Sequence, residues 1–126
     1  MSVTGIYPAN RPQLSDDEAA LLAKLPHAAQ QSRKATHAEL HAAIVSLAQK
    51  SGFTLELEVV GTGFMAMIAR DLRVVANVRG GGEETFYCES QRGDLLRQLA
   101  EEIARSCGPQ IVLPSNGDEG TLVIAS

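Results

Sequence analysis

The feature that most constrains the fold is a change of hydrophobic period at Gly52–Phe53. Before this point, apolar residues recur at the spacing of an amphipathic helix; they are Leu40, Ala43, Ile44, Leu47 and Ala48. Thr36 and Glu39 form a capping-box pattern at the start of that helix, and Gly52 provides a stop at its end. Over 53–59 apolar and polar residues alternate instead, which is typical of a half-buried antiparallel strand. The chain therefore passes from a helix into a sheet here.

Three further strands are predicted after this one, and glycine-containing turns separate them. The turn Gly61-Thr62-Gly63 precedes a strand over 64–70, and another strand follows over 72–79. A run of glycines at 80–82 then precedes a strand over 84–89. Because no helical pattern intervenes, these strands favour an antiparallel meander over a parallel sheet.

The C-terminal part predicts a second helix and a hairpin. Asp94 opens a segment that ends at Gly108-Pro109, and its apolar residues share one arc; they are Leu95, Leu96, Leu99, Ile103 and Cys107. Two short apolar strands, 111–113 and 121–125, flank an Asn116-Gly117 turn. We expect these strands to close the sheet as a hairpin.

The N-terminal part predicts an arm followed by short helices. Residues 1–14 contain two prolines and a glycine and have no period, so we expect an irregular arm that is able to reach a partner. A capping-box pattern at Ser15 begins a helix over 16–25. Pro26 interrupts that helix and can begin a second helical segment that continues through Ala35.

Together these elements predict a single α+β domain over residues 15–126. Its parts are N-terminal helices, an antiparallel β-meander of about four strands, one amphipathic helix and a C-terminal β-hairpin. A chain of 126 residues with 44% hydrophobic residues has the size and composition of one domain with its own core. This order of elements is similar to that of secretion chaperones and of immunity-type inhibitor proteins. The similarity is one of architecture and establishes no function.

Composition excludes several classes of partner. The net charge of −4 and the scattered basic residues argue against nucleic-acid binding, and the absence of tryptophan leaves few surfaces for base stacking. No window of about 18 apolar residues and no signal-peptide pattern is present, so we expect neither membrane insertion nor export. Two cysteines do not make the disulfide framework of a small secreted domain. We therefore expect a small acidic cytoplasmic protein with reduced thiols.

His37 and His41 lie four residues apart and project from the same side of the predicted helix, as two ligands of a divalent metal would. In the zinc-protease motif an acid directly follows the first histidine, whereas here Glu39 lies two residues after His37. A third ligand would have to come from Cys88 or from an acidic side chain elsewhere. Both histidines border an apolar arc, where packing histidines are common. A packing role is favoured, and a small enzyme or metal or small-ligand site around His37 and His41 is the alternative hypothesis.

We predict no catalytic residue, no metal ligand and no cofactor. Cys88 shares a strand face with Phe86, and Cys107 lies on the apolar face of the second helix, so both have the pattern of inert buried thiols. The glycine run 80–82 lies between two strands and precedes two glutamates, whereas a phosphate-binding loop leads from a strand into a helix. The run is therefore predicted to be a hairpin loop.

The remaining candidate is a surface of the sheet. If the apolar residues of 53–59 face the core, the opposite sheet face carries charged side chains and a tyrosine. Met65 and Met67 share one side of the second strand and join this face if that side is the outer one. The predicted partner-binding residues are Glu56, Glu58, Met65, Met67, Arg73 and Tyr87. Flexible methionines among charges suit protein recognition. Two alternatives exist for this face. It could be a solvated surface with cross-strand ion pairs, because alternation by itself produces such a pattern. The N-terminal helices could also cover it.

These considerations favour a non-catalytic protein-binding module of inhibitor, immunity, chaperone or adaptor type, whose partner is another protein. The function is inferred by elimination of the histidine pair, the cysteines and the glycine run as sites. The strand edges of a meander also make a homodimer compatible with this function.

Overall fold

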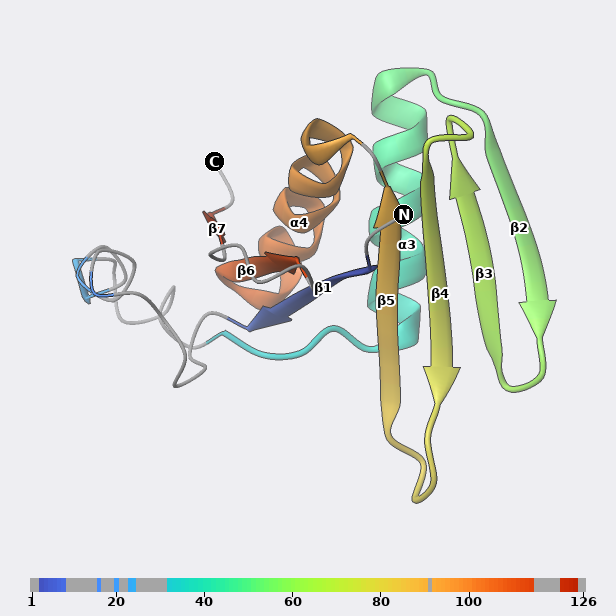
Figure 1. The fold of residues 1–126 in the computed structure, drawn as a ribbon, viewed down its shortest axis with the longest axis horizontal. Helices are drawn as coiled ribbons and strands as arrows, with labels where there is room; N and C mark the ends of the chain where they lie inside the picture. Colours follow the sequence, from blue (N-terminus) through green and yellow to red (C-terminus); the bar gives the residue numbers. More distant parts are fainter. Residues whose placement is uncertain are drawn as a thin grey trace.

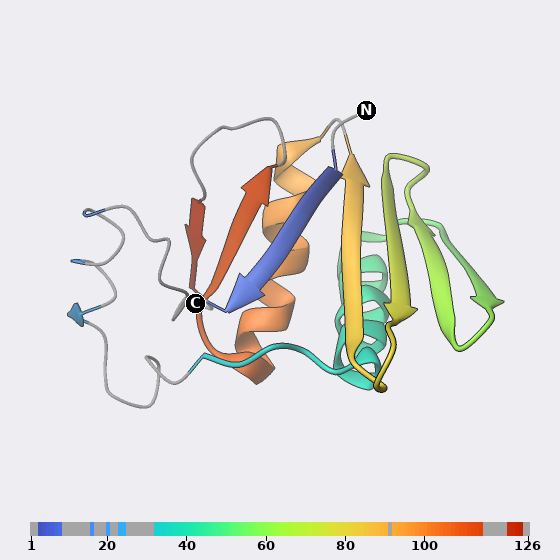
Figure 2. The ribbon, with the colours of Figure 1, turned by 60° about the horizontal axis from the view of Figure 1, so that its bottom comes forward.

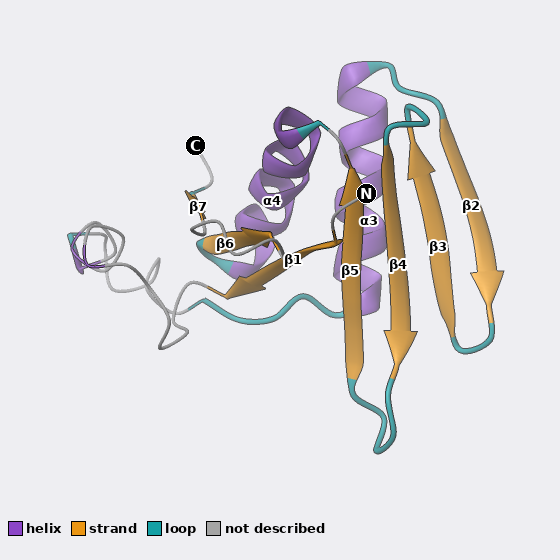
Figure 3. Cartoon of the chain, viewed as in Figure 1, coloured by secondary structure: helices purple, strands orange, loops and turns teal. Residues whose placement is uncertain are grey.

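The described residues of the chain fold into a seven-stranded antiparallel sheet with two long helices on one of its faces (Figures 1 and 3). The computed structural model of the protein describes residues 3–8, 16, 20, 23–24, 32–90, 92–114 and 121–124. The elements are β1 (Val3–Pro8), α3 (His37–Ser51), β2 (Leu55–Val60), β3 (Gly63–Ile68), β4 (Leu72–Val78), β5 (Glu84–Ser90), α4 (Gly93–Cys107), β6 (Gln110–Pro114) and β7 (Thr121–Val123). The fold is therefore mixed α+β.

Helix α3 has the two ends that its sequence predicts. The Thr36 hydroxyl accepts a hydrogen bond from the Glu39 backbone N–H, and the Glu39 carboxylate accepts one from the Thr36 N–H, which completes the capping box. At the other end Gly52 adopts a left-handed conformation with φ of 67°, which a glycine reaches without steric cost. The residues between these caps place one apolar face on the sheet.

Strand β1 corrects the prediction of an irregular arm at residues 1–14 for residues 3–8, and the rest of that arm lies outside the described residues. Its position in the sheet order β2-β3-β4-β5-β1-β6-β7 is between the meander and the C-terminal hairpin (Figure 2). Thr4 and Ile6 are buried, but Gly5 interrupts an alternation that is already short, and this hides the strand in the sequence. The Tyr7 ring lies over Gly5, where an added Cβ would be 2.2 Å from the ring atom Cε2. The sheet is thus larger than a four-stranded meander with a separate hairpin.

The other N-terminal predictions concern residues that are mostly not described. The capping box at Ser15 and most of the helix predicted over 16–25 lie outside the described residues. The helical segment predicted through Ala35 is wrong for residues 32–35, which have no regular secondary structure. There the Arg33 N–H donates to the carbonyl of Cys107 at 2.9 Å, and the Arg33 carbonyl accepts from Gln110 Nε2 at 3.2 Å. The backbone groups of Arg33 therefore form hydrogen bonds with the end of α4 and the start of β6, and not with residues of a helix of their own.

The core lies between the sheet and the two helices. Its fully buried members include Leu40 and Ile44 of α3, Leu95 and Leu99 of α4, and Val74 of β4. The second helix is present as predicted, and the glycine run 80–82 lies in the loop between β4 and β5. Strands β6 and β7 pair as the predicted hairpin, although β7 ends at Val123 and the Asn116-Gly117 turn lies outside the described residues. Neither of the described helices combines the length and the apolar character that a membrane span requires.

A buried carboxylate joins the two helices. Glu102 of α4 accepts hydrogen bonds from the Ser46 hydroxyl at 2.7 Å and from Lys50 Nζ at 2.9 Å, both on α3. Arg105 lies 3.2 Å from the same carboxylate. Burial by itself would raise the pKa of Glu102, but the hydrogen bonds from Lys50 and Ser46 outweigh it and lower the pKa. Glu102 therefore stays charged and fixes the helices to each other.

In the turn between β3 and β4, the backbone conformation of residue 70 favours glycine over alanine. Ala69 and Arg70 both have positive φ, 55° and 62°, and the Asp71 N–H donates to the Ile68 carbonyl across them. Because Cβ disfavours this conformation, Arg70→Gly should raise the free energy of unfolding by about 1 kcal/mol relative to Arg70→Ala. Both variants lose the guanidinium, so urea denaturation of the pair isolates the backbone effect. Equal stability of the two variants would contradict the assignment of strain to this residue.

Candidate functional site

The candidate site is the sheet face that points away from α3 and α4, which we call the open face. Ala66 and Ile68 of β3 and Val74 of β4 are buried beneath the helices. Successive side chains of a strand point to opposite sides, so the residues between them lie on the open face. Among the described residues no helix covers this face (Figure 2). All six predicted partner-binding residues belong to it: Glu56, Glu58, Met65, Met67, Arg73 and Tyr87.

The register of the strands arranges these residues in two rows across the sheet. In the first row Glu56 pairs with Met67, Met67 with Arg73, and Arg73 with Glu89. In the second row the order is Glu58, Met65, Val75 and Tyr87. Each row therefore runs from an exposed glutamate on β2, through a methionine on β3, to the centre of the sheet.

Arg73 connects the two rows. Its Nε donates to Met65 Sδ at 3.2 Å, and its Nη1 lies 3.5 Å from the carboxylate of Glu89. The Arg73 side chain is still 42% exposed, so the ion pair with Glu89 is a surface pair that is accessible to solvent. The guanidinium thus holds one methionine in place and partly neutralises the acid at the centre of the open face.

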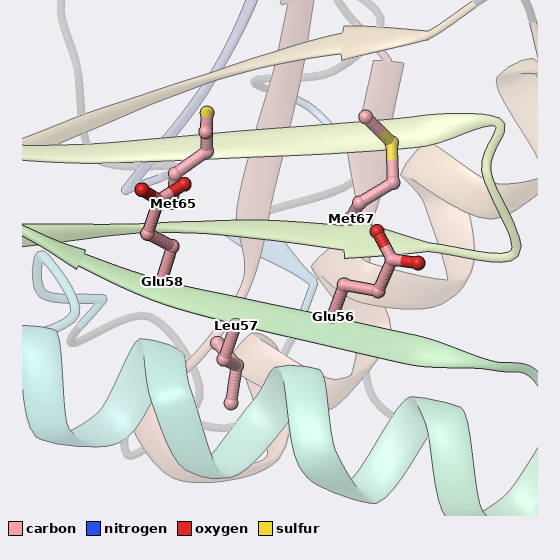
Figure 4. A pocket seen from close by; sticks show the side chains of 5 residues that line it. All are labelled: Glu56, Leu57, Glu58, Met65 and Met67. Carbon is pink, nitrogen blue, oxygen red and sulfur yellow. The ribbon is translucent and has the colours of Figure 1, made fainter.

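A groove with a volume of about 390 Å³ lies at the β2–β3 end of the open face (Figure 4). Met65 lies beside Glu58, and Met67 beside Glu56, while Leu57 points the opposite way, towards α3. Glu56 and Glu58 form no ion pair with a basic side chain anywhere in the described ranges. We call this feature the open-face groove; it combines apolar methionines with two carboxylates that pair with none of the described basic side chains.

A second groove lies on the other side of β2, beside α3, and we call it the helix-side groove. Its volume is about 340 Å³, and its lining includes His37, His41, Leu57, Val59 and Phe64. Both imidazoles pack edge-on against the Phe64 ring, with centroid distances of 5.8 Å and 5.9 Å. Nε2 of His37 also lies 3.2 Å from the Thr85 carbonyl. The histidines are therefore engaged in packing.

The helix-side groove shows no set of metal ligands. Within the described residues, no group of three or more His, Cys, Asp or Glu side chains is placed to hold a metal ion. Cys88, which the sequence offers as a third ligand, is completely buried, and that burial raises the pKa of its thiol to about 12. A thiol with such a pKa stays protonated and is a poor ligand and nucleophile.

Glu84 fixes the α3 wall of the helix-side groove. Its carboxylate accepts a hydrogen bond from the His37 backbone N–H at 2.7 Å, at the first residue of the helix. In the neighbouring residues Lys34 Nζ lies 3.2 Å from the Glu83 carboxylate. The start of β5 and the loop before it are therefore tied to the start of α3, and sequence patterns gave no sign of this contact.

Cys107 lies beside a charged pair at the end of α4. Arg33 donates two hydrogen bonds to the carboxylate of Glu39, one from each Nη, and Cys107 Sγ lies 3.7 Å from that carboxylate. Burial, together with the negative charge of Glu39, raises the pKa of the Cys107 thiol. The prediction that both cysteines are buried thiols is confirmed, and both are free.

The exposure of β2 was missed by sequence reasoning. Alternation placed Leu57 and Val59 on the face that meets the core, and they are on the helix side of the sheet. However, Leu57 is 44% exposed and Val59 is 83% exposed, because β2 extends beyond the area that α3 covers. Alternation reports which side a residue is on but not where the covering helix stops, so it carries no signal for this exposure.

Comparison with known proteins gives no relative from which a function could be transferred. No family model, no curated protein and no solved structure matches the chain. A function must therefore be inferred from the chemistry of the open face and of the strand edge beside it.

The charged pair predicts a pH-dependent stability. The Arg33 guanidinium, followed by the Thr36 backbone amide, lowers the pKa of the Glu39 carboxyl from 4.5 to about 2. The folded state therefore binds fewer protons than the unfolded state below about pH 4.5, and stability falls as the pH falls towards 2. The difference in the free energy of unfolding between wild type and Glu39→Gln should be largest near pH 7 and should shrink as the pH falls from about 4.5 towards 2.

Denaturant unfolding measured between pH 2 and pH 7 checks this expectation. Arg33→Gln is the matched variant, because it removes the main cause of the lowered pKa and should weaken the same pH dependence. A difference between wild type and Glu39→Gln that stays constant over the whole range would contradict the assignment.

Proposed function

We propose that the chain is a non-catalytic protein-binding module that engages another protein through the open face. The proposal rests on one observation. The six residues come from the four neighbouring strands β2 to β5 and lie on one face that no described helix covers. The inhibitor, immunity, chaperone and adaptor classes all act by such binding.

The chemistry of the open face supports protein recognition. Met65 and Met67 are flexible and polarisable, so they adapt to the shape of an opposing apolar side chain. Arg73 and Tyr87 belong to the residue types that are enriched at protein interfaces. Around them the glutamates supply a charged rim, which contributes specificity and association rate more than affinity.

The environment of the thiols supports a reducing compartment, and we include a cytoplasmic location in the proposal. Cys88 and Cys107 are both free and both buried, Cys88 beneath α4 and α3 and Cys107 at the end of α4. Neither thiol forms part of the open face, so binding there needs no cysteine chemistry.

Replacement of the two methionines tests the proposal. Met65→Gln with Met67→Gln keeps the length of both side chains but removes their apolar character, so it should weaken binding of the partner by about tenfold or more. The partner is first isolated by co-purification with the tagged chain from the cells that make it. Its affinity for each variant is then measured by isothermal titration calorimetry.

Arg97→Gln is the matched control, because Arg97 is an exposed residue on the solvent side of α4 and away from the open face. It should leave the affinity unchanged, and circular dichroism should show that every variant is folded. If the methionine variant binds its partner as tightly as wild type does, the open face is not the binding surface.

A further inference from the structure

Strand β2 is the end strand of the sheet, so one of its backbone edges has no partner strand among the described residues (Figure 1). Its register with β3 is continuous from the pair Leu55–Ile68 to the pair Val60–Gly63. The strand contains no proline, no lysine and no bulge, which are common devices that protect an edge from additional strands. The edge is therefore able to pair with another extended segment.

The turn after β2 indicates which backbone groups point outward. Gly61 and Thr62 form a two-residue loop with φ of 60° at Gly61, and Val60 pairs with Gly63 across it. The pair that closes such a loop exchanges both hydrogen bonds, and hydrogen-bonded pairs then alternate along the strands. Leu57 and Val59 consequently direct their N–H and C=O groups away from β3.

The side chains of β2 give its two faces different chemistry. Glu56 and Glu58 lie on the open face and have no ion-pair partner within the described ranges. Leu57 and Val59 lie on the other face, exposed and lining the helix-side groove. An added strand would therefore meet negative charge on one side and an apolar groove on the other.

Pairing of β2 with β2 of a second copy is disfavoured by these charges. In an antiparallel pair of β2 strands from two copies, a two-fold axis relates the strands. Two registers pair most of each strand: in one the axis passes at Leu57, and in the other it passes at Glu58. The first places Glu56 opposite Glu58 of the other copy, and the second places the two copies of Glu58 opposite each other. Like charges directly opposite each other destabilise an antiparallel pair.

We propose that β2 accepts an extended segment of the partner protein as an eighth strand, and that this segment alternates basic and apolar residues. The basic side chains lie beside Glu56 and Glu58, and the apolar ones enter the helix-side groove beside Leu57 and Val59. Main-chain hydrogen bonds to the outward edge of β2 supply affinity, and the alternation supplies specificity. This inference rests on the proposed function and names the chemistry of its partner.

A synthetic probe tests the inference directly. The probe is an acetylated and amidated eight-residue peptide in which lysine and valine alternate. Titration of the isotope-labelled chain at low ionic strength should shift the amide NMR signals of β2 and slow hydrogen exchange at Leu57 and Val59. A peptide of alternating glutamate and valine should bind at least about tenfold more weakly.

Two comparisons separate strand addition from simple charge attraction. A peptide with four valines followed by four lysines has the same composition without the alternation, and it should also bind at least about tenfold more weakly. Equal affinity of the alternating and block peptides would overturn the proposal, as would shifts that avoid β2.

Substitutions in β2 test the backbone and the charges separately. Val59→Pro removes an outward N–H and should abolish the protection at Leu57, whereas Val59→Ala keeps the N–H and should retain most of the binding. Glu56→Lys with Glu58→Lys should reverse the preference, so that the glutamate–valine peptide binds more tightly. The charge reversal provides a readout even if Val59→Pro fails to fold, and an unchanged preference would overturn the proposal.

The inference and the proposed function fail in different ways. A natural partner that is released by Met65→Gln with Met67→Gln but retained by Val59→Pro supports binding to the open face and overturns strand addition. A partner that both variants retain overturns both ideas. If sedimentation shows a dimer that Val59→Pro dissociates, a second copy occupies the edge and the proposed partner chemistry is wrong.

Discussion

The fold depends on the pairing of β1 with two strands that lie far from it along the chain. Val3 and Thr4 pair with β5, and the stretch from Thr4 to Pro8 pairs with β6, so β1 joins the meander and the hairpin into one sheet. Closing such long loops costs conformational entropy. Burial of Ile6 and packing of α4 against β5, β6 and β7 offset that cost, because they bury apolar surface that only a continuous sheet provides.

Packing both helices on one side of this sheet determines the character of the other side. Once Ala66 and Ile68 lie beneath the helices, the pleat directs Met65 and Met67 outward. The pairing of Arg73 with Glu89 compensates charge at the centre of the open face, whereas the two glutamates of β2 have no ion-pair partner in the part of the chain that the structure describes. The open face therefore carries both charges at its centre and only negative charge at its β2 edge, so its two ends differ in electrostatic character.

Local signals in the sequence predicted the elements whose ends carry specific chemistry. The capping box at Thr36 and the alternation after Gly52 placed α3 and the meander, and alternation also grouped the six residues of the open face. Strand β1 was missed because Gly5 breaks a short period and its partners are distant in sequence. The exposure of Val59 and the absence of a described helix over the open face depend on where helices stop, which is set by tertiary packing and leaves no local pattern.

The contact between Glu84 and the start of α3 has a consequence for the energetics of recognition. Because the Glu84 carboxylate binds the His37 N–H, while the His37 and His41 rings rest on Phe64, the first turn of α3 is held from two sides. The wall of the helix-side groove is thus preorganised. For the proposed strand addition, this lowers the conformational entropy that the receptor side would lose on association, whereas the added segment still loses its own.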